Sequence, residues 1–140
     1  MQRAESEYWR DKQDNKGRAS KEKTFNYAFY LVQSERAEEQ RQGVHLLETG
    51  LLTSDPLCLE YLYYHAVGCH KLGEYQRAVE SLETMLTVQP QHPQAAKLLA
   101  LVREDMRTDA LIGGGVVVGG LAALAGGIFL LGKALANRKK

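Results

Sequence analysis

An uninterrupted apolar segment near the C-terminus places the strongest constraint on this chain. From Ala110 to Gly132 there are 23 consecutive residues without a charge, most of them Gly, Ala, Val, Leu and Ile. As a helix they would span about 34 Å, which matches the hydrocarbon core of a bilayer. A soluble protein would have to surround such a helix, and a head of roughly 90 residues is too small to do so. We therefore expect a transmembrane helix over 110–132.

The residues after this segment predict how it is inserted and where. Only residues 133–140 follow, so we expect insertion after translation, with the preceding head left in the cytosol. A moderately hydrophobic span with a basic end is typical of targeting to mitochondria or peroxisomes, and the endoplasmic reticulum is the competing destination. The basic residues of this tail are Lys133, Arg138, Lys139 and Lys140.

Small residues recur every four positions in the predicted span, which places them on one helix face. They are Gly115, Gly119, Ala123 and Gly127. Such a ridge lets two helix backbones approach closely, so one interpretation is self-association in the membrane. The other is that Gly and Ala only lower the hydrophobicity of the span for targeting.

The net charge of +1 conceals two regions of opposite sign. Before Ala110 the chain has 14 basic and 17 acidic residues, whereas the remainder has 4 basic and no acidic residues. A head with a net charge near −3 lacks the clustered cations that bind a phosphate backbone, which argues against nucleic-acid binding. Cys58 and Cys69 lie too far apart along one predicted helix to form a disulfide, which favours a reducing compartment.

Between Lys21 and Met106 the apolar residues recur at helical spacing, and no strand pattern competes. Turn and cap signals predict five helices, over 20–33, 38–52, 56–73, 74–88 and 93–108, preceded by an arm over 1–19 that is mobile or a short helix. Ser20 is expected to cap the first helix, and Asp55 with Pro56 to begin the third. The last helix has an apolar face formed by Ala96, Leu99, Val102 and Met106.

Two of these helices share a pattern at an offset of 35 residues, Arg41-Gln-Gly43-Val44 against Gln76-Arg-Ala78-Val79. This offset is close to the period of a tetratricopeptide repeat. In the second unit, small residues at Ala66 and Ala78 allow close helix crossing, Gly73 supplies the turn, Tyr75 fills the space above it and Pro90 stops the second helix. The sequence thus predicts an all-α, tetratricopeptide-like helical bundle over 20–108, with two helix pairs and flanking helices.

The leading helices of the two pairs are apolar or aromatic nearly all round, which is typical of helices that are covered on two sides and line an inner groove. The groove is short and suits one peptide segment or one partner helix. The alternative is that these aromatic residues belong to the core. The residues expected on the groove are Phe29, Val32, Tyr63, Val67, His70 and Lys71.

Motifs for catalysis and for metal or cofactor binding are absent from the sequence. No Gly-rich phosphate loop precedes a helix, no Cys or His pair has zinc spacing, and His65 and His70 do not share a helix face. We therefore expect no enzyme, no cofactor and no metal site, and we interpret His45, His65, His70 and His92 as solvated or core residues.

Several stretches resemble the mitochondrial fission 1 protein family, and together they cover residues 20–132. The resemblance implies an adaptor on the outer mitochondrial and peroxisomal membranes that recruits a dynamin-related GTPase, directly or through other adaptors, and promotes organelle division. It also implies a groove that binds partner segments or the protein's own N-terminal arm. The stretches are Phe25-Asn-Tyr27-Ala28 to Leu31-Val32, Gly43-Val44 to Leu46-Leu47-Glu48, Tyr64 to Ala66-Val67-Gly68, Glu74-Tyr75 with Ala78, and Gln89-Pro90-Gln91 with Gln94-Ala95.

The chain departs from the family at two places. The family's N-terminal helix is longer and rich in Leu and Val, whereas residues 1–18 offer only Tyr8 and Trp9 as apolar anchors. The connector after the first helix reads Ser34-Glu-Arg in place of Ser-Lys-Tyr.

Two other functions are alternatives to a fission adaptor. A tail-anchored receptor for chaperones or imported precursors would need several cations on the groove, where Lys71 is nearly alone. A structural protein acting through membrane self-association would work without its head.

Overall fold

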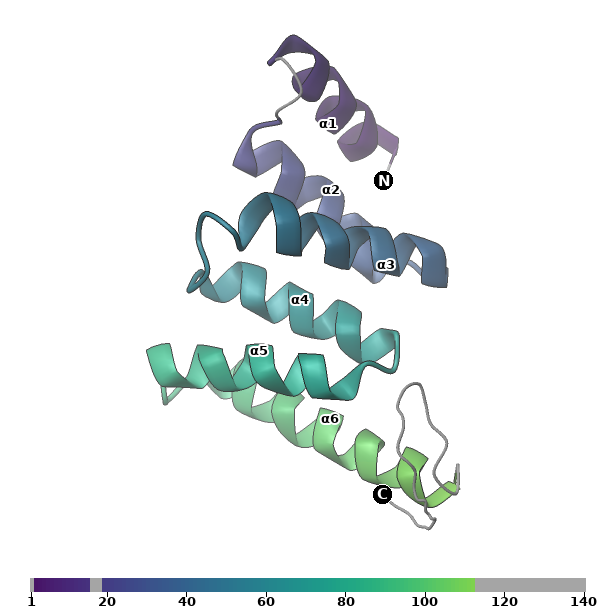
Figure 1. Cartoon of the computed structure of the whole chain (residues 1–140), viewed down its shortest axis with the longest axis vertical. Helices are drawn as coiled ribbons and strands as arrows, with labels where there is room; N and C mark the ends of the chain where they lie inside the picture. Colours follow the sequence, from purple (N-terminus) through teal and green to yellow (C-terminus); the bar gives the residue numbers. More distant parts are fainter. Residues whose placement is uncertain (1, 16–18, 113–140) are drawn as a thin grey trace.

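The computed structural model describes residues 2–15 and 19–112, which form six α-helices and one short π-helical segment. The helices follow one another through the stack in chain order, from α1 at one end to α6 at the other (Figure 1). This arrangement confirms the prediction of an all-α, tetratricopeptide-like bundle. The elements are α1 (Gln2–Asp14), α2 (Lys21–Gln33), α3 (Ala37–Leu46), η1 (Leu47–Leu51), α4 (Leu59–Lys71), α5 (Tyr75–Val88) and α6 (Pro93–Ile112).

The apolar side chains of the stack divide into one large core and one small cluster. The large core runs from α2 to α6 and contains fully buried residues such as Leu47, Leu82 and Val102. The small cluster joins α1 to α2 through Tyr8, which packs against Tyr27 and Leu31. Helix α1 is therefore attached to the stack through far less buried apolar surface than its neighbours, and burial of such surface is the main source of stability.

The second helix pair, α4 and α5, follows the predicted pattern. Ala66 and Ala78 are both fully buried, as expected for small residues where two helices cross closely. Gly73 lies in the turn between the helices with φ +77°, a conformation that glycine adopts without steric cost. The Tyr75 hydroxyl donates a hydrogen bond to the Asp109 carboxylate at 2.5 Å, which joins the start of α5 to α6.

The first helix pair, α2 and α3, comes closest at Gly43. A Cβ atom on Gly43 would lie 2.7 Å from Cγ1 of Val32 and 3.0 Å from its backbone nitrogen. One on Gly68 of α4 would lie 2.5 Å from Cγ2 of Val44. Ser20 caps α2 as predicted, because its hydroxyl accepts a hydrogen bond from the Lys23 amide at 3.2 Å. Glycine thus sets the spacing of three successive helices, α2, α3 and α4.

Two predicted helix boundaries in this region are wrong. The helix expected over 38–52 is α-helical only to Leu46, and it continues as the π-helical η1, where the Leu52 amide bonds to the Leu47 carbonyl five residues back at 2.7 Å. Helix α4 begins at Leu59 and not at Pro56. The Asp55 carboxylate accepts a hydrogen bond from Lys21 Nζ at 2.5 Å, and no side-chain cap bond is present at the start of α4.

The last helix differs from its prediction in length and in its buried face. Helix α6 runs to Ile112, four residues beyond the expected end, and it buries Ala95 while Ala96 is exposed. Within the described part of the chain, none of the helices combines the length and the apolar character needed to cross a membrane. Residues 113–132 of the predicted span lie outside the described residues, as do its small residues and the basic tail of 133–140.

Candidate partner-binding surface

Aromatic side chains of α2 and α4 meet along one face of the stack. The ring of Phe25 lies 5.5 Å from that of Tyr61 and 5.8 Å from that of Tyr64, measured between centroids. The Phe29 ring lies 5.1 Å from Tyr64 and nearly perpendicular to it, at 76°. These four residues are only partly buried, so their rings pack against the core and also present surface to a ligand.

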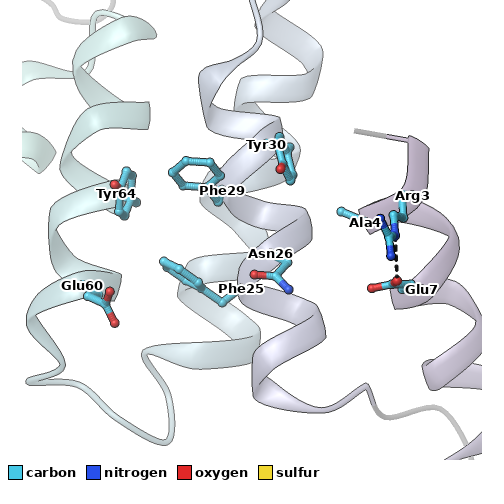
Figure 2. Close-up of a pocket in the computed structure, with 9 residues that line it drawn as sticks. All are labelled: Arg3, Ala4, Glu7, Phe25, Asn26, Phe29, Tyr30, Glu60 and Tyr64. Carbon is cyan, nitrogen blue, oxygen red and sulfur yellow. Dashed lines mark ion pairs between the residues drawn. The ribbon is translucent and has the colours of Figure 1, made fainter.

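A cavity of about 540 Å³ opens above these rings, between α1, α2 and α4 (Figure 2). We call it the α1–α2–α4 cavity. Its volume falls within the range of protein pockets that bind compact ligands. Helix α1 forms one wall of this cavity and does not fill it. The lining residues are Arg3, Ala4 and Glu7 of α1, Phe25, Asn26, Phe29 and Tyr30 of α2, and Glu60 and Tyr64 of α4.

Opposite charges stand on the two sides of the cavity. On α1, the Glu7 carboxylate lies 3.4 Å from Arg3 and 3.5 Å from Lys23 of α2, so two cations surround one anion. On α4, Glu60 makes no ion pair or side-chain hydrogen bond within residues 2–15 and 19–112. The lining residues Arg3 and Glu7 pair with each other, so the charged lining group that has no such pair among the described residues is Glu60, on the α4 side.

The predicted groove residues divide into three groups in the structure. Phe29 lines the cavity, and Tyr63 stacks edge-on against Tyr64 at 5.3 Å, with Val67 partly buried one turn further along α4. Val32, by contrast, is fully buried between Gly43 and Gly68 and lines no surface. That prediction is wrong, because the close approach of α3 and α4 at these two glycines encloses the Val32 side chain in the core.

His70 and Lys71 connect neighbouring helices at the C-terminal end of α4. Lys71 Nζ donates to the backbone carbonyl of Gln33 at 3.2 Å and so ties α4 to the end of α2. His70 Nε2 lies 2.6 Å from the Asp105 carboxylate of α6. Both predicted groove residues thus help to fix the spacing of α2, α4 and α6.

Of the nine residues that line the cavity, the predicted groove residues include Phe29 alone, and the other eight were missed. Tyr30 directly follows the predicted Phe29, and Phe25 and Asn26 lie one helical turn before these two residues on α2. Glu60 lies one turn before Tyr64, on the same face of α4. Arg3 and Glu7 belong to α1, and their role depends on where that helix docks, for which the arm's mostly charged sequence gave no signal.

A buried histidine joins the two helix pairs away from the cavity. His65 Nε2 lies 2.7 Å from the Glu48 carboxylate of η1, and Nδ1 lies 2.6 Å from the Ser81 hydroxyl of α5. Burial lowers the pKa of His65, and the charge of Glu74 opposes this shift to a smaller extent. A neutral imidazole that donates from Nε2 and accepts from Ser81 satisfies both contacts. This histidine is a core residue, as predicted.

Comparisons with known proteins agree with this fold. A family model described as the Fis1 C-terminal tetratricopeptide repeat matches residues 59–111. The mitochondrial fission 1 protein of Eremothecium gossypii is 44% identical over 108 residues, which cover 76% of this chain and 69% of that protein. The corresponding protein of Mus musculus is 38% identical over 127 residues, which cover 88% and 82%.

Solved structures of the yeast protein are also similar. The solution structure of yeast Fis1 matches with a TM-score of 0.69 at 27% identity, covering 87% of this chain and 82% of that one. The crystal structure of yeast Fis1 in complex with an Mdv1 fragment matches with a TM-score of 0.64 at 27% identity, covering 75% and 83%.

The helix stack and its open aromatic cavity define a tetratricopeptide-type adaptor domain, a class that binds partner segments. The chain belongs to the mitochondrial fission 1 protein family. Membership confirms the resemblance of the sequence and the prediction of an adaptor that is not an enzyme. It also implies association with mitochondria.

Proposed function

We propose that this chain is a mitochondrial fission adaptor that recruits division proteins through the α1–α2–α4 cavity. A span over 110–132 holds it in the outer membrane of mitochondria and of peroxisomes, and the head over 20–108 faces the cytosol. Its partners are adaptors of the Mdv1 kind, a dynamin-related GTPase, or both. A structure of the yeast relative in complex with an Mdv1 fragment supports this class of partner.

The observation that carries the proposal is the group of partly exposed aromatic rings around the cavity. Tyr30 remains 45% exposed on α2, and Phe29 and Tyr64 present ring surface beside it. Aromatic residues in a concave site supply most of the binding free energy at many interfaces. An extended segment or one turn of a partner helix would bury them.

A receptor for chaperones or precursors receives less support from the cavity. Such a receptor would need several free cations to clamp a terminal carboxylate. Arg3 is already paired with Glu7, and Lys71 is bound to the Gln33 carbonyl. The charges near the cavity therefore do not converge on an anionic ligand.

Imaging of mitochondria tests the proposal directly. Cells lacking their own family member would express the full chain, the double variant Asn26→Ala/Tyr30→Ala, or a form truncated after Ile112. Both substituted residues are exposed, so the core stays intact. We expect the full chain to restore fission, the double variant to reach mitochondria without restoring it, and the truncated form to be diffuse.

Leu101→Ala on α6 is the matched control, because Leu101 is 49% exposed and does not line the cavity. This variant should restore fission like the unmodified chain. Full activity of the double variant would overturn the cavity as the recruitment site, and mitochondrial targeting of the truncated form would overturn the span. The small-residue ridge from Gly115 to Gly127 stays a prediction of self-association, which crosslinking of the full chain in mitochondria would test.

A further inference from the structure

The free acidic group of the α1–α2–α4 cavity faces a set of aromatic rings. Glu60 of α4 and the rings of Phe25, Phe29 and Tyr64 line the same space (Figure 2). On the opposite wall, Glu7 forms ion pairs with Arg3 and with Lys23. A ligand entering this space therefore meets one uncompensated carboxylate beside π systems.

The rings present their faces in several directions. Phe29 is inclined at 76° to Tyr64 and at 80° to Tyr30, and Phe25 is inclined at 68° to Tyr64. Aromatic faces carry negative electrostatic potential and attract cations within about 6 Å of the ring centre. Rings at steep angles surround a cation from more than one side, and an adjacent carboxylate adds to the attraction.

The pKa of Tyr64 is raised, mainly by burial and to a smaller extent by the neighbouring Tyr63 and Glu60. The Tyr64 hydroxyl therefore stays protonated at physiological pH, and its ring remains a neutral surface. Glu60 itself is exposed to solvent.

We propose that the α1–α2–α4 cavity binds its partner through an arginine or lysine side chain, held between the Glu60 carboxylate and the rings of Phe25, Phe29 and Tyr64. This inference rests on the proposed function, in which the cavity is the recruitment site, and adds the chemistry of the bound segment. The volume of about 540 Å³ exceeds that of a single side chain, so apolar residues next to the basic one also enter. Segments with acidic residues at this point are repelled by Glu60.

Competition between short peptides tests this chemistry. The full chain in detergent micelles would be saturated with a labelled fragment of an Mdv1-type adaptor that contains its N-terminal extension and coiled coil. Displacement would then be measured with acetyl-Leu-Arg-Leu amide and with the same peptide carrying citrulline, the neutral isostere of arginine. We expect the arginine peptide to displace the fragment at concentrations about tenfold lower than the citrulline peptide.

The variant Glu60→Gln should remove most of this difference, and Glu80→Gln should not. Glu80 is exposed on α5 and does not line the cavity, so it controls for the loss of one negative charge. If the fragment binds and the two peptides displace it equally well, the inference is overturned and the proposed function is upheld. Failure of the fragment to bind the unmodified chain would count against the proposed function itself.

Discussion

The two helix pairs have the same architecture but are held in it by different means. Small residues, Ala66 and Ala78, lie where α4 and α5 cross, a glycine with positive φ forms the turn between them, and His65 bonds to Ser81 across the pair. Between α2 and α3, the connector needs side-chain hydrogen bonds. Gln40 Nε2 donates to the Ser34 carbonyl at 2.7 Å, and the Ser34 hydroxyl accepts from the Arg36 amide at 3.0 Å.

This difference shows which features of a repeat can be recognised in a sequence. Small residues and glycine leave a periodic pattern, because a close crossing or a positive φ excludes most other residue types. Hydrogen bonds from side chains to the backbone can be made by several residue types at several positions. The residues predicted for the second pair therefore lie where expected, whereas in the first pair Val32, predicted to line the groove, is fully buried.

The largest expected effect is at the two glycines where α2, α3 and α4 approach closely, Gly43 and Gly68. Gly43→Ala should lower the free energy of unfolding by about 3 kcal/mol, because the new Cβ meets the backbone of α2, which cannot move aside easily. Gly68→Ala should be less severe, because its nearest neighbours are side-chain atoms of Val44 and Val32. Urea unfolding of residues 1–112 would give both values.

Two further variants make this prediction specific. Gly50→Ala should leave stability nearly unchanged, because its Cβ would lie 3.4 Å from the nearest atom, Cγ2 of Thr24. Adding Val44→Ala to Gly68→Ala should be less destabilising than the sum of the single changes by about 1 kcal/mol. Strict additivity of these two changes would show that Gly68 is not needed for the approach of α4 to α3.

A smaller effect is expected at the turn of the second pair. Gly73→Ala should lower the free energy of unfolding by about 1 kcal/mol, because alanine is strained at φ +77° although no atom lies within 4 Å of the new Cβ. Gly73→Asn should lower the free energy of unfolding by a smaller amount, since asparagine tolerates this conformation better. Equal losses for the two variants in the same unfolding assay would contradict a purely conformational origin.

The smallest expected effect concerns His65, the residue that links the two helix pairs. Because the pKa of His65 is lowered by burial, the folded state takes up fewer protons than the unfolded state below the ordinary histidine pKa of about 6.5. The contribution of the neutral His65 to the free energy of unfolding should therefore be fully present above that pH and be lost progressively as the pH decreases below 6.5. His65→Gln should show a shallower pH dependence of the urea midpoint between pH 7 and 5.5, and an unchanged slope would assign the effect to other groups.

Most of the fold was predictable because its helix signals are local. The Ser20 cap, the Gly73 turn and the apolar periodicity are all properties of neighbouring residues. The start of α4 was missed because Asp55, a good cap by type, binds Lys21 from a distant part of the chain instead. The π-helical η1 was missed because its sequence continues the helical pattern of α3 without a break.

The candidate site was predicted only in part because it is assembled from three helices. The aromatic character of α2 and α4 indicated a groove, and of the residues predicted for it Phe29 lines the cavity. Whether a residue such as Val32 faces the cavity or the core depends on the helix rotation that Gly43 and Gly68 impose. That rotation is a property of the packed stack, not of one segment.

The small cluster that holds α1 has a thermodynamic consequence for partner binding. Helix α1 supplies one wall of the cavity, yet only Tyr8, Tyr27 and Leu31 form the buried cluster that attaches it to the stack. For a partner that needs this wall, the apparent dissociation constant equals the intrinsic constant divided by the fraction of molecules with α1 docked. By reciprocity, an occupied cavity favours the docked helix to the same extent. Docking of the arm and capture of a partner are thus two readouts of a single coupled equilibrium.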